Sequence, residues 1–161
     1  MHFLLAAILA ITGVGPLSPV RFTQRSGWST GAGVAHACPG VSADRCTRVS
    51  GWATTATWRD CPDCLPRRTA AALPPNGIAI QVSLLREIPL TARETVTWPL
   101  HVRASDVVTP FEGLPARIGA YRLFAQVKRY EVYALVLFGR GKPTARQIAA
   151  ANVQLRTARL P

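Results

Sequence analysis

The sequence has few acidic residues and almost no lysine. Its 161 residues hold 8 Asp and Glu against 19 Lys and Arg, and 17 of those 19 are arginine, giving a formal charge of +11. No two of the acids have the spacing of a glycosidase pair or a metal-ligand set. The arginines are dispersed, without the clustering or aromatic interleaving that is typical of a nucleic-acid surface. We therefore expect no carboxylate-based catalysis, no metal or other cofactor and no nucleic-acid partner.

The chain also lacks an apolar run long enough to cross a bilayer comfortably. Residues 3–14 form an uncharged apolar run of 12 residues, whereas a transmembrane helix needs about 20. A signal-peptide hydrophobic region needs about 7–15 residues, although only Met1 and His2 precede this run and they supply no positive charge. We expect a signal peptide or membrane anchor at 1–20 and a Gly/Ser/Thr-rich linker without periodicity at 21–37.

The four cysteines all lie in one stretch of 27 residues, as Cys38, Cys46, Cys61 and Cys64. An even number of cysteines close to a possible signal is typical of two disulfides formed outside the cytoplasm. Four cysteines allow three pairings, and the sequence leaves all three open. Zinc is an alternative, but only one CxxC knuckle is present, whereas a four-cysteine zinc ribbon usually has two.

Residues 61–64 read C-P-D-C, the form found in thioredoxin-like oxidoreductases. In that family the first cysteine lies at a helix N-terminus, where the helix dipole stabilises its thiolate. Here Pro66 would interrupt any helix that began after Cys61. We therefore expect a structural disulfide staple, and the alternative is an extracytoplasmic thiol–disulfide oxidoreductase that uses Cys61 and Cys64.

The second half of the chain carries strand patterns. Residues 78–84 alternate with a period of two, which predicts a half-buried strand. Residues 120–128 and 131–138 predict a hairpin whose second arm, EVYALVLF, is apolar enough to be central and covered on both faces. Residues 95–102 are rich in strand formers but contain Pro99, which favours an edge strand or a bulge.

The C-terminal segment predicts a helix. Thr144 and Gln147 have the spacing of a capping box, and apolar residues then recur every three or four positions, at Ile148, Ala151, Leu155 and Ala158. We expect this helix to cover one face of an antiparallel sheet of four or five strands. The fold class is α+β, as a single disulfide-stapled domain over 38–161.

The turn that precedes this helix is basic. Arg140, Lys142 and Thr144 stand at the predicted helix N-terminus, where backbone N–H groups and the helix dipole favour negative charge. The sequence therefore predicts an anion-binding site at these three residues.

The segments PPNGIAIQVSL, FEGLPARIGAYRLFAQV and EVYALVLFGRGKPTARQIAAANVQLRTARLP lie within 74–161. This half of the chain resembles uncharacterised small exported proteins of high-GC actinobacteria. The resemblance implies a bacterial envelope location and assigns no activity to any residue. We expect an exported or membrane-tethered, non-catalytic binding or structural module, whose basic surface meets anionic envelope polymers or lipid head groups.

Overall fold

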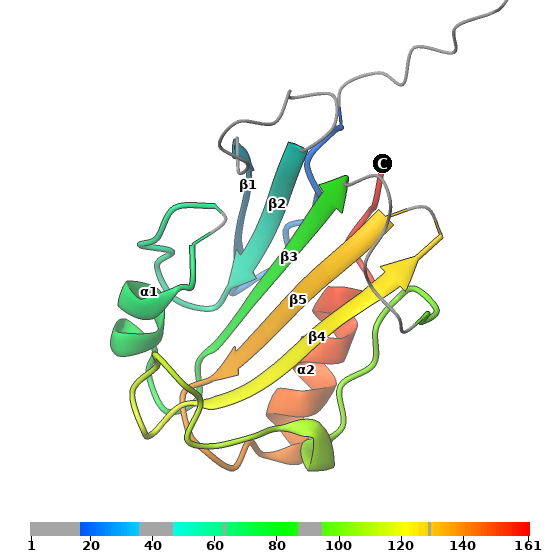
Figure 1. Cartoon of the computed structure of the whole chain (residues 1–161). Coiled ribbons are helices and arrows are strands. Elements are labelled where there is room, and N and C mark those ends of the chain that lie inside the picture. Colours follow the sequence, from blue (N-terminus) through cyan, green and yellow to red (C-terminus); the bar gives the residue numbers. More distant parts are fainter. Residues whose placement is uncertain (1–16, 36–46, 63, 87–94, 129) are drawn as a thin grey trace, which may run out of the picture.

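The computed structural model describes residues 17–35, 47–62, 64–86, 95–128 and 130–161. Its centre is an antiparallel sheet of five strands in the order β1-β2-β3-β5-β4 (Figure 1). The strands are β1 Ser29–Ala35, β2 Thr47–Thr54, β3 Ile78–Arg86, β4 Gly119–Val127 and β5 Tyr130–Phe138. The helices are α1 Arg67–Ala72, a short 3₁₀ helix Ala104–Asp106 and α2 Ala145–Leu155. The predicted α+β class, with the C-terminal helix packed against the sheet, is confirmed.

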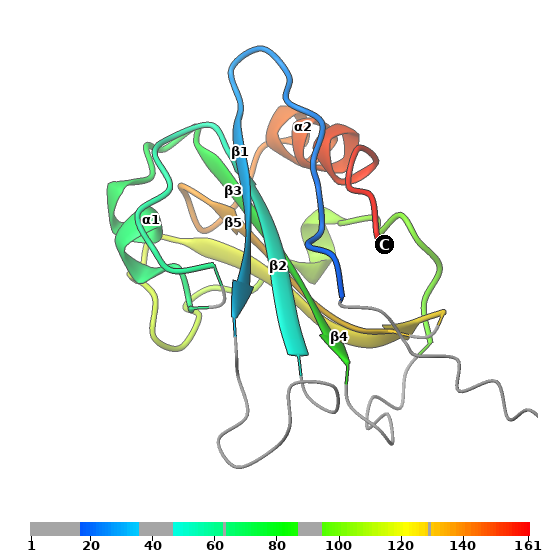
Figure 2. The ribbon, with the colours of Figure 1, turned by 90° about the horizontal axis from the view of Figure 1, so that it is seen from above.

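The main core lies between the sheet and α2 (Figure 2). The side chains of β3 and β5 that face α2 are buried, so the predicted alternation in β3 places the right residues in the core. The prediction that β3 is half-buried is wrong, because Ala79, Gln81 and Ser83 on its other face are buried as well. From these strands the core takes Ile78, Ile80, Val82, Leu84, Val132, Ala134, Val136 and Phe138, and from α2 it takes Ala151 and Leu155. At roughly 1.5–3 kcal/mol for each fully buried aliphatic or aromatic side chain, this layer is the main source of stability.

The capping box predicted for α2 is present. The Thr144 hydroxyl accepts a hydrogen bond from the Gln147 N–H at 3.2 Å, and the Gln147 side chain accepts one from the Thr144 N–H at 3.0 Å. Gln147 is itself buried and donates from Nε2 to the carbonyls of Pro75 and Gly77. The cap therefore fixes where the helix begins and also ties it to the turn that leads into β3.

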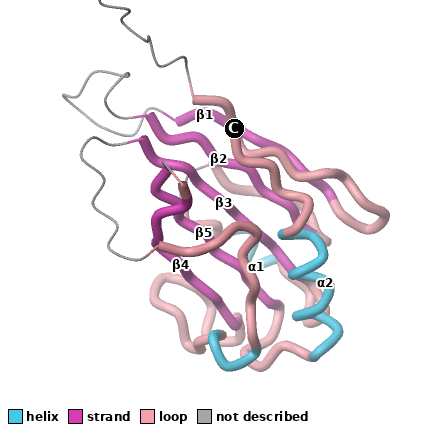
Figure 3. The backbone as a smooth tube through the Cα atoms, turned by 90° about the vertical axis from the view of Figure 1, so that its right-hand side faces the viewer, coloured by secondary structure: helices cyan, strands magenta, loops and turns pink. Residues whose placement is uncertain are grey.

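The prediction of a linker over 21–37 is wrong for the residues that the structure describes. Within it, β1 forms an edge strand of the sheet. The preceding segment lies beside the end of the chain, where the backbones of Arg21 and Arg159 exchange two hydrogen bonds (Figures 2 and 3). Val20 and Phe22 are buried in the main core. The folded unit therefore starts well before residue 38.

Residues 95–102 form neither an edge strand nor a bulge. Apart from an isolated bridge from Thr95 to β4, the segment has no strand pairing. It is held by α2 instead, because the Asn152 side chain accepts from the Val102 N–H at 2.8 Å and donates to the Val102 carbonyl at 2.9 Å. A side-chain amide thus takes the place of a neighbouring strand.

A smaller apolar cluster covers part of the opposite face of the sheet. There Ala70 of α1 and Leu73, the residue that follows the helix, pack against side chains of β3, β4 and β5. With six residues, α1 covers only one end of this face. The rest of the face is left to the loop that precedes α1, to the segment of Phe111 and Leu114 before β4, and to open surface.

Candidate functional site

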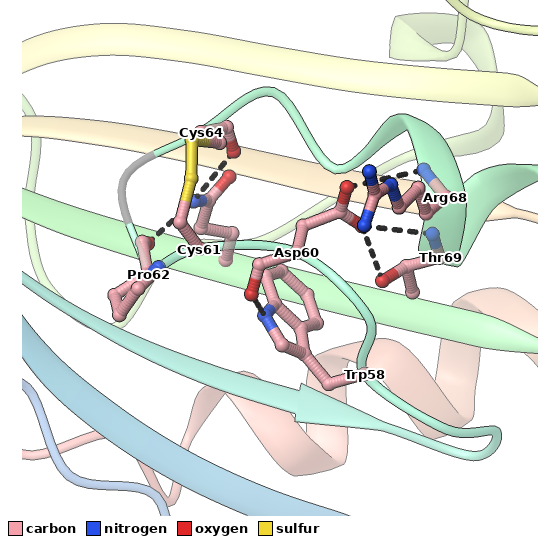
Figure 4. The surroundings of a disulfide bond; sticks show 8 residues. Trp58, Asp60, Cys61, Pro62, Cys64, Arg68 and Thr69 are labelled. Carbon is pink, nitrogen blue, oxygen red and sulfur yellow. Dashed lines mark hydrogen bonds between the residues drawn. A yellow bond between two sulfur atoms is a disulfide. The ribbon is translucent and has the colours of Figure 1, made fainter.

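The loop between β2 and α1 is closed by a disulfide that joins Cys61 to Cys64, with their Cα atoms 5.2 Å apart (Figure 4). Both cysteines are exposed. Only one of the three pairings that the sequence left open contains this Cys61–Cys64 bond. The other two predicted disulfide residues, Cys38 and Cys46, lie outside the described residues. A disulfide pair is compatible with an extracytoplasmic protein.

The acid that precedes the disulfide caps α1. The Asp60 carboxylate accepts hydrogen bonds from the backbone N–H groups of Arg68 at 3.1 Å and Thr69 at 2.8 Å, and from the Thr69 hydroxyl at 2.6 Å (Figure 4). The Thr69 hydroxyl in turn accepts from the Arg59 N–H at 2.9 Å. The residue at the N-cap position makes no side-chain cap. Asp60, which lies outside the helix, therefore supplies the acceptor for the first N–H groups of α1.

This arrangement argues against a thiolate of the thioredoxin kind. The first helix after the motif begins at Arg67, six residues beyond Cys61. Its first-turn N–H groups already bind the Asp60 carboxylate, so the positive end of the helix dipole is compensated by that acid. The sulfur atoms lack the environment that usually makes a cysteine nucleophilic.

The disulfide loop is fixed to the sheet beneath it. The Gln81 side chain on β3 donates from Nε2 to the carbonyls of Pro62 at 2.7 Å and Cys64 at 3.1 Å. Pro62 lies over Gly33 of β1, where an added Cβ would come within 2.3 Å of the proline ring. The loop therefore stands as a fixed wall on this face of the sheet.

Two tryptophans support the base of that wall. Trp58 stacks on Trp52 of β2, with ring centroids 5.2 Å apart and planes 5° from parallel. The Trp58 indole N–H donates to the Asp60 carbonyl at 2.7 Å. Trp52 covers Gly31 of β1, where an added Cβ would lie 2.2 Å from the indole ring. The glycines that made this segment look like a linker are the positions on which the loop and its tryptophans pack.

Beside this wall lies a groove of about 260 Å³. We call it the Tyr133 groove, and its lining residues are Arg48, Cys64, Leu65, Gln81, Ser83, Leu85, Phe124 and Tyr133. Every residue of β5 is buried except Tyr133. The strand predicted to be covered on both faces therefore has one opening, and it lies at this groove.

Strand register explains which side chains meet there. Ser83 of β3 and Phe124 of β4 are the direct cross-strand partners of Tyr133, so the three side chains lie in one row across the sheet. The Ser83 hydroxyl pairs with the Ser50 hydroxyl of β2 at 2.7 Å. Phe124 keeps 46% of its surface exposed. The groove thus has a polar floor at one end and an open aromatic ring at the other.

Positive charge lies on both sides of the Tyr133 phenol. Burial raises the pKa of Tyr133 above its ordinary value of 10.0, while the charges of Arg122 and Arg48 act in the opposite direction. Among the described residues, neither arginine has a carboxylate partner and the phenol has no hydrogen-bond partner. Arg122 lies over the ring of Phe111, 5.4 Å from its centroid. The groove lining therefore offers one guanidinium group, that of Arg48, and one hydroxyl to a negatively charged ligand, and Arg122 adds positive charge from outside the lining.

The structure does not gather the predicted anion-binding residues into one pocket. Arg140 donates from Nε to the Pro75 carbonyl at 3.3 Å, and the Thr144 hydroxyl serves the helix cap. Lys142 lines a different cleft, beside the 3₁₀ helix. Whether any of the three binds an anion stays a prediction.

Sequence reasoning missed Arg48, Arg122 and Tyr133. The alternation of β4 indicates that Arg122 and Phe124 share a face, but nothing local brings Arg48 to the same place. Neither a protein-family model nor a curated protein nor a solved structure matches this chain. No helix in the described ranges has the length and apolar character needed to span a membrane.

Proposed function

We propose that this protein is an exported or membrane-tethered, non-catalytic binding module of a bacterial cell envelope, and that the Tyr133 groove holds an anionic group of its ligand. One observation carries the proposal: Arg48 lines the groove together with the half-buried phenol of Tyr133, Arg122 lies on the neighbouring strand β4, and neither arginine is neutralised by a carboxylate in the described part of the chain. Guanidinium groups left unpaired beside a concave surface are the usual means of binding phosphate or carboxylate.

The groove gives each part of such a ligand a contact. Arg48 meets the charged oxygens and Arg122 adds positive charge from β4, while the Tyr133 hydroxyl, whose ordinary pKa of 10.0 already lies above neutral pH and is raised further by burial, donates a hydrogen bond. Phe124 and Leu85 offer apolar contact to the uncharged remainder. The disulfide loop acts as a fixed side wall. This chemistry suits a phosphate or carboxylate group of an envelope polymer or of a lipid head group.

The direct test measures binding to two probes, a poly(glycerol phosphate) chain and vesicles that contain phosphatidylglycerol. Vesicles of phosphatidylcholine alone are the uncharged reference. Arg48→Gln and Arg122→Gln should each weaken binding about tenfold, which corresponds to about 1.4 kcal/mol, and binding should fall as salt is added. Arg159→Gln, at an exposed arginine on the C-terminal segment, is the matched control and should bind like the wild type.

The two probes separate the two sources of the anion. Binding to the polymer alone identifies an envelope polymer, and binding to the charged vesicles alone identifies a lipid head group. The proposal fails if both groove variants bind both probes as tightly as the Arg159 control.

The oxidoreductase alternative has one observation in its favour, because the Cys61–Cys64 pair is local, exposed and at the edge of the groove. It requires catalysed thiol–disulfide exchange, whereas the binding module does not. Incubating the protein with dithiothreitol and a disulfide-containing peptide measures that exchange. A turnover that disappears in Cys61→Ser would establish the alternative, while a Cys61→Ser/Cys64→Ser variant that keeps anion binding would support the binding module.

A further inference from the structure

A second cleft lies on the α2 side of the sheet, opposite the Tyr133 groove. Its volume is about 520 Å³, twice that of the groove and within the range of pockets that hold small ligands. It lies where the turn before β1, the turn before β3 and the first turns of α2 meet. Its lining residues are Trp28, Thr55, Asn76, Ile78, Thr144, Arg146, Gln147 and Ala150.

Trp28 forms the aromatic wall of this cleft. It follows Gly27, whose φ of +76° allows the tight turn, and its N–H donates to the Arg25 carbonyl at 3.0 Å. The indole packs against the main core and is half-buried, so the ring is supported from behind. Within the described residues its indole N–H has no hydrogen-bond partner. A supported ring with a free N–H can take both the apolar face and a hydroxyl of a ligand.

The charge in the cleft comes from Arg146. This residue is in the first turn of α2, is exposed, and has no ion-pair partner in the part of the chain that the structure describes. A cation in the first turn of a helix is unfavourable, because that end of the helix already carries positive partial charge. An anionic ligand beside Arg146 would be attracted both by the guanidinium group and by the positive end of the helix, and would offset the repulsion between them.

The remaining polar groups are divided between structural use and free use. The Thr55 and Thr144 hydroxyls are occupied, since they hydrogen-bond at the start of β3 and at the cap of α2. Asn76 is different, because its side-chain oxygen accepts from Arg140 at 3.5 Å while its NH₂ group has no partner among the described residues. The free groups are therefore an indole N–H, an amide NH₂ and a guanidinium.

We propose that this cleft is a saccharide site for an acidic pyranoside. The C–H face of the sugar ring would stack on Trp28, its hydroxyls would accept hydrogen bonds from Asn76, and its carboxylate or phosphate would bind Arg146. Neither the apolar groups nor the charge alone requires a sugar, but a supported aromatic ring, an amide donor and a cation around one cavity match the three parts of an acidic sugar. The inference is independent of the Tyr133 groove, which lies on the other face.

Trigalacturonate is the acidic probe and cellotriose the neutral one, with binding followed by calorimetry and by backbone amide shifts in NMR spectra. Trigalacturonate should shift the amides of residues 145–150 and the Trp28 indole N–H. Arg146→Gln should weaken its binding at least fivefold. Arg156→Gln, at an exposed arginine just past the end of the same helix, is the matched control and should change nothing.

Trp28→Phe keeps an aromatic ring against the core but removes the indole N–H and part of the stacking surface, so it should weaken binding about threefold in a folded protein. Arg48→Gln should leave this binding intact, which separates the site from the Tyr133 groove. The proposal is overturned if trigalacturonate shifts no amide of the cleft, if Arg146→Gln binds it like the Arg156 control, or if cellotriose binds as tightly.

Discussion

Replacing Asp60 by alanine should destabilise the protein by about 2 kcal/mol. Three hydrogen bonds end on this carboxylate, two of them from backbone N–H groups of α1 and one from the Thr69 hydroxyl. Each hydrogen bond to a charged group contributes roughly 1.5–3 kcal/mol when buried, but the Arg68 contact is exposed and water can replace it. Loss of a helix cap costs roughly 0.5–2 kcal/mol, and the additional bond from Thr69 places the sum near the upper end of that range.

The measurement is urea unfolding with the disulfide intact, supported by thermal melts. For a domain of this size roughly 2–4 °C accompanies each kcal/mol, so Asp60→Ala should lower the midpoint by about 4–8 °C. Asp60→Asn keeps one acceptor oxygen and should lose about half as much. Asp106→Ala is the control, because that exposed carboxylate also accepts two hydrogen bonds, from the Arg103 N–H and the Ser105 hydroxyl, but at a short 3₁₀ helix. We expect less than about 1 kcal/mol there.

Hydrogen exchange identifies where stability is lost. In Asp60→Ala the amides of Arg68 and Thr69 should exchange faster, because their acceptor is gone. The amides of β3 and β5 should lose only the protection that corresponds to the fall in the global free energy of unfolding. If Asp60→Ala loses no more stability than Asp106→Ala, or if those two amides keep their protection, the carboxylate does not hold α1 in place. In that case the carboxylate does not occupy the positive end of the helix either.

Three further outcomes follow from the packing. Gly33→Ala should lose about 1–3 kcal/mol, because its Cβ would lie 2.3 Å from the Pro62 ring. Adding Pro62→Ala should recover part of that loss, and strict additivity in a double-mutant cycle of urea midpoints would contradict the contact. Burial raises the pKa of Tyr133, so the folded state resists its ionisation. The stability this gives is complete below pH 10 and is lost as the pH rises through the folded pKa; a Tyr133→Phe variant with the same decline would refute this. Asn152→Ala leaves the N–H and carbonyl of Val102 without their acceptor and donor and should lose about 2–4 kcal/mol in urea unfolding, whereas a loss below about 0.5 kcal/mol would contradict it.

The elements that could be predicted are those whose signal is local. The cap of α2 needs two residues three positions apart, and Thr144 and Gln147 form it as predicted. The hairpin of β4 and β5 needs only adjacent apolar segments, and its register is fixed by the tight turn between Val127 and Tyr130. In both cases the residues that make the structure are neighbours in the sequence, so their chemistry can be recognised without the rest of the fold.

The N-terminal strand could not be predicted because its side chains do not supply its stability. Its sequence, STGAGVA, has no alternation, and Gly31 and Gly33 are usually read as signs of a flexible linker. In the fold these two residues have no side chain, and this leaves room for Trp52 and Pro62 to pack over them. The apolar surface that stabilises β1 on this face belongs to β2 and to the disulfide loop, and a pattern search along β1 itself cannot detect it.

The Tyr133 groove could not be predicted for a similar reason, because its residues come from strands that are far apart in the sequence. Arg48 is on β2, Tyr133 on β5 and Arg122 on β4, and only the sheet order β1-β2-β3-β5-β4 brings them to one face. In the sequence these arginines are part of a dispersed excess of positive charge that indicates no binding site. The strand register brings two of those charges beside Tyr133, the one residue of β5 that is not buried. If Arg48→Gln and Arg122→Gln weaken anion binding while Arg159→Gln does not, binding depends on where the strands place the arginines and not on the formal charge of +11.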